Sequence, residues 1–243
     1  MRPFVILQAG NPPSAIRQQF GSFAQMFQGV LGVAAPVRVV RCYAGEPLPA
    51  LRDVAAVLIT GSPANVTDDA PWMRVLVPWL SQAVEREVPT LGVCFGHQIL
   101  AHALGGTVGY HPRGREAGTQ SICLTEAAAG DAWLAGLPAR FAAQLVHEQT
   151  VLRPPPGAQV LGYNDHDACQ ILRLAPHAVS VQFHPEFSAD IMRAYLVTMA
   201  AKLEAEGLQP HRLHAQVRDT PEARGLVERF VRHHAASACS STS

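Results

Sequence analysis

The sequence has no long apolar run, no excess of either charge and no closely paired cysteines. No apolar run reaches the ~18 residues that a membrane-spanning helix needs, so we expect no membrane span. The 19 Lys and Arg residues balance 19 Asp and Glu residues, which gives no reason to expect nucleic acid or an anionic membrane as a partner. The five cysteines are scattered without a Cys-x-x-Cys pair, which argues against a disulfide framework and a zinc cluster.

Signals for secretion, for phosphate binding and for metal binding are missing as well. Residues 1–8 enter a strand-like run without a cleavage region, which together with the scattered cysteines favours the cytoplasm. No Gly-rich phosphate loop occurs, and the eleven histidines include no His-x-x-x-His pair with a nearby Glu. We therefore expect neither a cofactor nor a metal.

Length and apolar content favour one large α/β domain. With 243 residues, 48% of them hydrophobic, the chain is long enough to bury a full core. Nearly continuous apolar runs predict buried parallel strands, and apolar residues at helical spacing predict covering helices. The expected strands span 4–7, 37–42, 54–60 and 90–93, with helices over about 14–30, 68–83 and 95–104. This order predicts a three-layer α/β/α fold with a doubly wound, largely parallel central sheet.

The pattern changes after Gly106, where shorter runs alternate apolar with polar residues. They predict an antiparallel extension of the sheet. The loop 111–115 between two of them has two arginines that could contact a carboxylate, but a solvated loop is favoured. The expected strands span 107–110, 119–124, 141–146, 158–163, 169–174 and 178–183, and an amphipathic helix follows over 188–203. We assign residues 1–205 to the main domain and 206–243 to a C-terminal extension, with one helix at about 219–234 and a frayed tail over 235–243.

Cys94 lies at the turn between a predicted strand and the helix that follows it. The segment Gly92-Val-Cys-Phe-Gly96 has the Gly-x-nucleophile-x-Gly form of a nucleophile elbow, with sulfur in place of a hydroxyl. Glycines permit a sharp turn, and free NH groups at a helix start favour a thiolate and an adjacent oxyanion. A buried structural cysteine is the alternative. The flanking glycines favour the nucleophile.

A second chemical cluster, Gln182-Phe-His-Pro-Glu-Phe187, ends another predicted strand. In an extended segment, residues two apart point to the same side with Cα atoms ~6.5 Å apart, so His184 and Glu186 can meet. A carboxylate on one ring nitrogen leaves the other free as a base. Taken alone, the segment also fits a surface turn. Together with the elbow, it favours a Cys-His-carboxylate site, because parallel neighbours share an edge.

The sequence resembles a class I (triad-type) glutamine amidotransferase domain. The resemblance rests on Gly92-Val-Cys-Phe-Gly-His-Gln98, Gly61-Ser-Pro63 and Val181-Gln-Phe-His-Pro-Glu186, and spans about Phe4 to Leu203. The sequence is most similar to the amidotransferase half of GMP synthase and to its stand-alone relatives, which include γ-glutamyl peptidases.

The resemblance implies a role for each matching residue. Cys94 is the expected nucleophile, His184 the base and then the acid, and Glu186 the group that orients His184. Gln98 is an expected glutamine-binding residue. The Gly61-Ser62 loop and the NH of Phe95 are expected to form the oxyanion hole.

Three departures from the family pattern stand out. In the family, the loop at Gly61-Ser62 more often reads Gly-Gly-Pro. Ser62 therefore adds a Cβ that affects the geometry of the expected oxyanion hole. Leu145-Val-His-Glu-Gln149 resembles the family's Ser-His-Gly-Asp turn, and its His147 either lines the site or caps a strand. The roughly 40 residues after Leu203 are too few for an ATP-pyrophosphatase, so we expect that this chain alone does not make GMP.

Three functions are compatible with these features. The first is a stand-alone glutamine amidotransferase that releases glutamate and supplies ammonia to an unidentified acceptor. The partner expected in that case is an ammonia-accepting synthase subunit. The second is a hydrolase of γ-glutamyl peptides or related compounds, with no ammonia acceptor. The third is a non-catalytic regulatory subunit, which the presence of all three triad residues disfavours.

Overall fold

The structure is a computed structural model that describes residues 2–32 and 36–239. Its main sheet has the strand order β2-β1-β3-β4-β11-β10-β9-β6-β7, and β5 and β8 form a second, two-stranded sheet. The strands are β1 (Phe4–Gln8), β2 (Val37–Arg41), β3 (Ala56–Ile59), β4 (Thr90–Val93), β5 (Thr107–Tyr110), β6 (Glu116–Leu124), β7 (Arg140–His147), β8 (Gln149–Arg153), β9 (Gln159–Tyr163), β10 (Ile171–Ala175) and β11 (Ala178–Val181).

Helices cover both faces of the main sheet, and short 3-10 turns lie in the connections. The helices are α1 (Ser14–Phe20), α2 (Phe23–Leu31), α3 (Pro71–Glu85), α4 (Phe95–Ala103), α5 (Ala189–Thr198), α6 (Ala200–Ala205), α7 (Pro210–Gln216) and α8 (Pro221–Cys239). The 3-10 turns are η1 (Cys42–Ala44), η2 (Leu51–Asp53), η3 (Val66–Asp68) and η4 (Glu126–Gly130).

The main sheet has a parallel half and an antiparallel half. Strands β2, β1, β3, β4 and β11 run parallel to one another, while β10, β9, β6 and β7 pair antiparallel. The parallel strands β1, β3, β4 and β11 are buried along their whole length, as the apolar runs of the sequence predict. The predicted three-layer fold with an antiparallel extension is confirmed.

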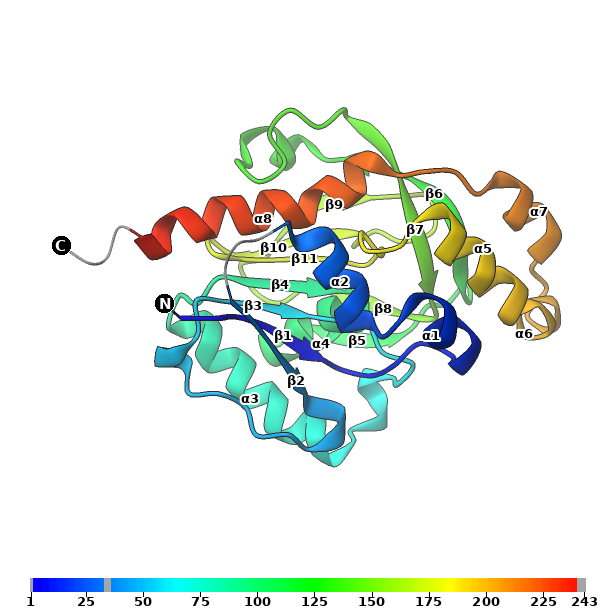
Figure 1. Cartoon of the computed structure of the whole chain (residues 1–243). Coiled ribbons are helices and arrows are strands. Elements are labelled where there is room, and N and C mark those ends of the chain that lie inside the picture. Colours follow the sequence, from blue (N-terminus) through cyan, green and yellow to red (C-terminus); the bar gives the residue numbers. More distant parts are fainter. Residues whose placement is uncertain (1, 33–35, 240–243) are drawn as a thin grey trace.

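Alternation along β1 shows how the layers are built. Phe4 and Ile6 belong to one hydrophobic cluster with α2 and α8, whereas Val5 and Leu7 belong to another with α3 and α4. Successive side chains of a strand point to opposite faces, so one strand contributes to both cores. Figure 1 shows α2 and α8 on one side of the sheet and α3 on the other.

The single helix expected over about 14–30 is wrong, because the structure divides it into α1 and α2. Gly21 adopts a φ of +86°, which a helix cannot accommodate, and Ser22 caps α2 in a capping box with Gln25. Ser14 is the first residue of α1, and Pro13 stands at its N-cap. The break lets α2 turn onto the sheet, while Asn11, Pro12 and Pro13 of the loop before α1 line the cleft described below.

The two-stranded sheet also differs from the prediction. Residues 107–110 were expected to extend the main sheet, but they form β5 and pair only with β8 among the strands of the described chain. Strand β8 itself was missed. Its sequence has just two large apolar residues, Val151 and Leu152, so its pattern is too short to recognise.

The C-terminal part contains more helix than the sequence pattern indicates. The helix expected over 188–203 is interrupted at Met199, between α5 and α6, and a further helix, α7, precedes α8. The expected frayed tail is helical as far as Cys239, and residues 240–243 lie outside the described part of the chain. Alanines favour helix, which accounts for the longer α8.

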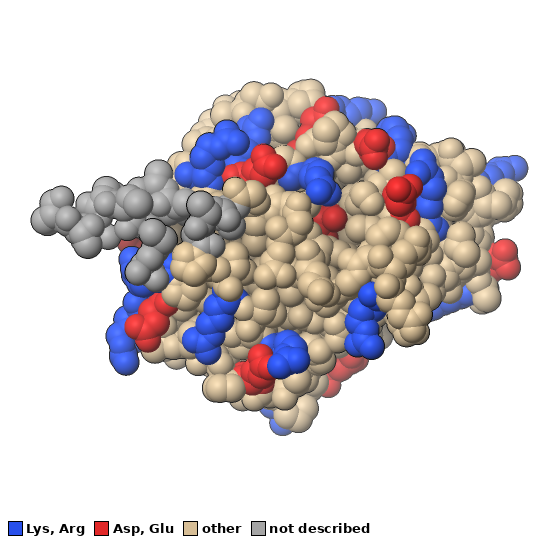
Figure 2. Space-filling view, viewed as in Figure 1, with Lys and Arg blue, Asp and Glu red and all other residues tan. Residues whose placement is uncertain are grey.

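The surface shows no segregation of charge in the view of Figure 2. Lys and Arg side chains are interspersed with Asp and Glu side chains, as the equal totals in the sequence suggest. Within the described ranges, no helix combines the length and apolar character needed to span a membrane.

Candidate active site

Cys94 occupies a sharp turn between β4 and α4. It is the N-cap of α4 and has a φ of +52° and a ψ of −106°, a region that residues other than glycine rarely adopt. Its NH donates to the carbonyl of Val181 on the neighbouring strand, at 2.9 Å. The predicted elbow geometry is therefore present, with the sulfur at the start of a helix.

The glycines of the elbow are required by close packing rather than by their φ angles. A Cβ on Gly96 would lie 2.3 Å from the carbonyl oxygen of Ile59, and a Cβ on Gly92 would lie 2.5 Å from the carbonyl oxygen of Gly96. Helix α4 consequently begins in direct contact with β3 and β4. This contact fixes where the Cys94 sulfur emerges.

His184 and Glu186 form the predicted pair just beyond β11. His184 Nδ1 lies 2.8 Å from Glu186 Oε1, and the two side chains are 3% and 0% exposed. The imidazole stacks on Phe187 at 4.1 Å between ring centroids. Strands β4 and β11 are parallel neighbours, so this pair and Cys94 meet at the same sheet edge.

The electrostatics of Cys94 and His184 are coupled. Burial raises the pKa of the Cys94 thiol, but the charge of His184, its hydrogen bond and the charge of His147 together outweigh this effect, so the thiol pKa is lowered. Burial likewise lowers the pKa of His184, but Glu186 and the Cys94 sulfur raise it to about 10. Both shifts favour a thiolate beside an imidazolium at neutral pH.

The Gly61-Ser62 loop lies directly against these groups. A Cβ on Gly61 would lie 2.9 Å from His184 Cε1 and 3.7 Å from the Cβ of Cys94. The Ser62 hydroxyl donates to the carbonyl of Ala9 at 2.8 Å and accepts from the NH of Ala64 at 3.1 Å. The extra side chain of Ser62 is thus engaged by the neighbouring backbone.

Phe95 and Gln98 lie on the first turns of α4. Phe95 is fully buried beside Trp72, and as the first helical residue its NH has no carbonyl partner within the helix. Gln98 Nε2 donates to the carbonyl of Gln149 at 2.6 Å and to Gln182 Oε1 at 2.9 Å. Gln98 therefore joins α4 to β8 and to the end of β11 while it lines the cleft.

His147 ends β7 and lines the cleft, which was one of its two predicted placements. Its Nε2 lies 2.9 Å from Glu116 Oε2, and its Nδ1 lies 3.0 Å from the carbonyl oxygen of Gln149. The ring is almost fully buried. Its contact with Glu116, the first residue of β6, links His147 to that strand.

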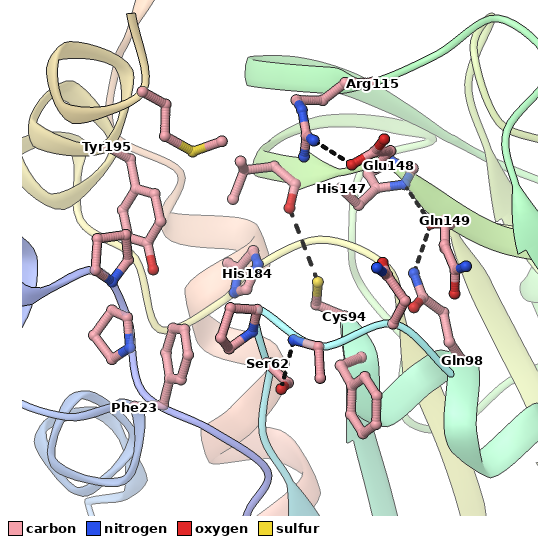
Figure 3. A pocket seen from close by; sticks show the side chains of 18 of the residues that line it. Phe23, Ser62, Cys94, Gln98, Arg115, His147, Glu148, Gln149, His184 and Tyr195 are labelled. Carbon is pink, nitrogen blue, oxygen red and sulfur yellow. Dashed lines mark hydrogen bonds and ion pairs between the residues drawn. The ribbon is translucent and has the colours of Figure 1, made fainter. Parts of the chain in front are cut away.

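The cleft above Cys94 has a volume of about 260 Å³ and two unlike walls. Phe23 and Tyr195 lie on the side of His184, whereas His147, Glu148 and Gln149 lie on the other side (Figure 3). The lining includes the apolar residues Pro12, Pro13, Phe23 and Met199, the ring of Tyr195 and the charged Lys202. The polar residues opposite are Gln98, Arg115, His147, Glu148 and Gln149.

Arg115 is the main lining residue that the sequence pattern did not reveal. Its loop was expected to be solvated, but its side chain is 7% exposed and forms ion pairs with Glu148 and Glu206. The expectation was wrong because both carboxylates come from segments distant in sequence. The available signal in the sequence was the arginine itself, since an arginine in this loop can contact a carboxylate.

Known proteins are similar to this chain in sequence and in fold. The family model described as "Glutamine amidotransferase class-I" matches residues 21–201. Gamma-glutamyl peptidase 5 of Arabidopsis thaliana is 27% identical over 195 residues, covering 78% of this chain and 77% of that protein. A glutamine-hydrolysing GMP synthase of Thermomicrobium roseum is 37% identical over 131 residues, covering 54% of this chain and 23% of the synthase. A glutamine amidotransferase structure from Thermotoga maritima superposes with a TM-score of 0.77 at 20% identity, covering 96% of this chain and 99% of that one.

Proposed function

We propose, because this chain belongs to the class I glutamine amidotransferase family, that Cys94, His184 and Glu186 hydrolyse the γ-amide of glutamine. The products are glutamate and ammonia, and the intermediate is a γ-glutamyl thioester. One observation carries the proposal. A cysteine in an elbow conformation shares a sheet edge with a buried His–Glu pair whose polar atoms are 2.8 Å apart.

In the acylation step, the Cys94 thiolate attacks the δ-carbon of glutamine. The carbon–nitrogen bond breaks, and the His184 imidazolium gives its proton to the departing ammonia. We assign the oxyanion hole to the NH of Phe95 and the Gly61-Ser62 loop. A donor of this kind contributes about 3 kcal/mol to the transition state.

In the deacylation step, His184 is neutral and takes a proton from water. The resulting hydroxide attacks the thioester carbon, the carbon–sulfur bond breaks, and glutamate leaves. The Cys94 thiolate and the His184 imidazolium are thereby restored. Glu186 holds the tautomer of His184 through both steps.

We further propose that the ammonia passes to a synthase subunit on another chain. The support is the similarity to GMP synthase, in which the matched region is 23% of the protein. An ammonia-consuming enzyme that co-purifies with this chain and raises its glutaminase rate is the expected finding.

The first prediction concerns the nucleophile. Purified protein should release glutamate from glutamine, and Cys94→Ala should abolish the release because no other group forms the thioester. Cys123→Ala is the matched control, since Cys123 is partly exposed on β6 and does not line the cleft. Undiminished activity of the Cys94 variant would overturn the triad assignment.

A second candidate function is the hydrolysis of γ-glutamyl compounds with an apolar amine. His184 must protonate the departing nitrogen, so the leaving group lies on the side of His184. That side carries Phe23 and Tyr195, and Met199, one helical turn after Tyr195, lines the same cleft. This lining suits an apolar substituent better than ammonia alone.

This second function leads to a second prediction, tested by comparing substrates. We expect γ-glutamyl-phenylalanine to have a higher kcat/KM than γ-glutamyl-lysine, since only the former matches the apolar wall. Met199→Glu should lower the rate with γ-glutamyl-phenylalanine and leave the rate with glutamine nearly unchanged. An absence of γ-glutamyl peptide cleavage counts this function out.

Failure of a glutamine-derived electrophile to label Cys94 would favour the non-catalytic alternative.

A further inference from the structure

Both ring nitrogens of His147 face hydrogen-bond acceptors. Nδ1 lies against the Gln149 carbonyl at 3.0 Å, and Nε2 lies against the Glu116 carboxylate at 2.9 Å. A neutral imidazole has one donor nitrogen and one acceptor nitrogen, whereas an imidazolium has two donors. A backbone carbonyl has no proton to donate, so the protonation of Glu116 decides the charge of His147.

Three side chains with hydrogen-bonding nitrogens surround the carboxyl group of Glu116. Glu116 Oε1 accepts from Asn164 Nδ2 at 2.6 Å, and Oε2 accepts from Gln170 Nε2 at 2.9 Å as well as facing His147. The carboxyl group is almost fully buried and is surrounded by donors. A carboxylate with several donors is stabilised in its charged form.

We propose that Glu116 holds His147 as an imidazolium, and that this fixed positive charge stabilises the Cys94 thiolate from the side of the cleft opposite His184. Figure 3 shows Cys94 between the two histidines in that view. Cys94 Sγ lies 4.0 Å from the carbonyl oxygen of Val146, the residue that precedes His147. The inference rests on the proposed function only in naming Cys94 as the nucleophile.

The remaining charges around His147 are consistent with a cation. Burial lowers the pKa of His147, but the hydrogen bond and the charge of Glu116 outweigh it and raise the pKa. Burial lowers the pKa of His97 to about 4, so that ring is neutral and adds no competing positive charge. The titratable groups that face or influence His147 are Glu116, Asp167, Cys94, His97, His111 and His166.

A second, fixed cation matters because His184 changes its protonation state during turnover. His184 is neutral from the moment it has protonated the leaving group until it takes a proton from water. When Cys94 then leaves as a thiolate, His147 provides positive charge that does not depend on His184. His147 acts here through its charge, which stabilises the thiolate form of Cys94.

The charge of His147 can be measured directly by NMR on protein labelled with ¹⁵N-histidine. His147→Gln identifies the resonances by their loss. At pH 7.5, an imidazolium shows both ring nitrogens protonated, which is the expected result. One protonated and one unprotonated nitrogen would mean that Glu116 carries the proton, and that result overturns the inference.

The effect on Cys94 can be measured from the pH dependence of its alkylation by iodoacetamide, followed by mass spectrometry. We expect His147→Gln and Glu116→Gln to raise the midpoint by about one pH unit, since a nearby opposite charge shifts a pKa by roughly 1–3. His177→Gln is the matched control and should leave the midpoint unchanged, because His177 Nε2 bonds to the carbonyl of Val84 and His177 does not line the cleft. An unchanged midpoint in both Gln variants overturns the effect on Cys94.

These measurements use no substrate, so their failure is distinct from failure of the proposed function. A chain that hydrolyses neither glutamine nor γ-glutamyl compounds can still hold His147 as a cation. Conversely, normal glutaminase activity with a neutral His147 removes this inference and leaves the triad intact. The measurement on the unaltered protein keeps the test decisive if a variant does not fold.

Discussion

The backbone of Cys94 is strained, and the strain has a structural cause. A φ of +52° in a non-glycine residue costs on the order of 1–3 kcal/mol, and the surrounding packing must supply that energy. Gly92 and Gly96 let the turn pack closely on neighbouring backbone, since any larger residue there would collide with carbonyl groups. The sulfur thus projects from a rigid turn.

A third prediction concerns Gly61. A Cβ at this position would meet His184 Cε1 at 2.9 Å, while Phe187 stacks on the imidazole at 4.1 Å, so the ring must shift. Gly61→Ala should lower kcat by about 100-fold, because small misplacements of reacting groups are that costly, with little change in Tm. The change is measured by glutamate release and thermal unfolding.

Gly29→Ala is the matched control for Gly61. Gly29 lies within α2 with open space where a Cβ would go. Its replacement should stabilise the fold by about 0.5–1 kcal/mol and leave kcat unchanged. Equal kcat values for the Gly61 and Gly29 variants would contradict the proposed contact between residue 61 and the imidazole.

Local sequence could predict some of the candidate site and not the rest. The elbow and the His184–Glu186 pair were predictable because each lies within a few consecutive residues, and the structure places them together as expected. The contacts of Arg115 with Glu148 and of Glu116 with His147 span more than thirty residues. Such contacts depend on strand pairing between β6 and β7, which local pattern does not reveal. The catalytic roles themselves stay predictions.

Arg115 joins three elements at the mouth of the cleft. It pairs with Glu148 after β7 and with Glu206 at the end of α6, and Lys202 Nζ lies 3.6 Å and 3.8 Å from the same two carboxylates. Because Arg115 is nearly buried, its charge needs these partners. The cluster therefore holds α6 beside the cleft.

A fourth prediction follows from the pKa of Glu206. The hydrogen bond from Arg115 lowers this pKa, so the folded protein binds the proton less readily than the unfolded chain does. The stabilisation is complete above the unfolded pKa of about 4.3 and is lost as the pH falls through the lowered folded value. The Tm difference between the unaltered protein and Glu206→Gln should therefore be largest near pH 7 and shrink as the pH falls below about 4.3.

Glu204→Gln provides the control on the same helix, since Glu204 is exposed. Its Tm should follow that of the unaltered protein across the same pH range. A Glu206→Gln difference that stays constant with pH would show that the ion pair contributes nothing measurable.

At the scale of the whole molecule, helix α8 is part of the main core. Leu226, Val227 and Phe230 belong to the same hydrophobic cluster as Phe4 of β1 and Phe27 of α2. The Phe230 and Phe4 rings meet edge to face with centroids 6.3 Å apart. Figure 1 shows α8 lying across the sheet beside α2. We therefore propose that the C-terminal extension folds together with residues 1–205.

A fifth prediction tests this dependence. Phe230→Ala should destabilise the protein by about 3–5 kcal/mol, since Phe230 is 1% exposed and its loss leaves a cavity. Arg232→Ala, on the exposed side of the same helix, should change stability by less than about 0.5 kcal/mol. Chemical denaturation of both variants provides the comparison. Similar midpoints for the two would mean that α8 is not part of the cooperative unit.

The overall fold was more predictable than the division between α1 and α2 or the presence of β8. Buried parallel strands carry nearly continuous apolar runs, so β1, β3 and β4 were visible in the sequence. The division between α1 and α2 depends on the φ of Gly21, and apolar spacing alone does not report it. Strand β8 forms because β5 pairs with it, which is a tertiary effect.

The pairing of β4 with β11 has a consequence for changes in chain length. Thr90 to Val93 lie opposite Ala178 to Val181, and only two residues separate Val181 from His184. Inserting or deleting one residue there would turn the imidazole to the other side of its strand, away from sulfur. The exposed turn at Pro156 and Gly157 has no such constraint. Insertions should therefore be tolerated in that turn and excluded beside His184.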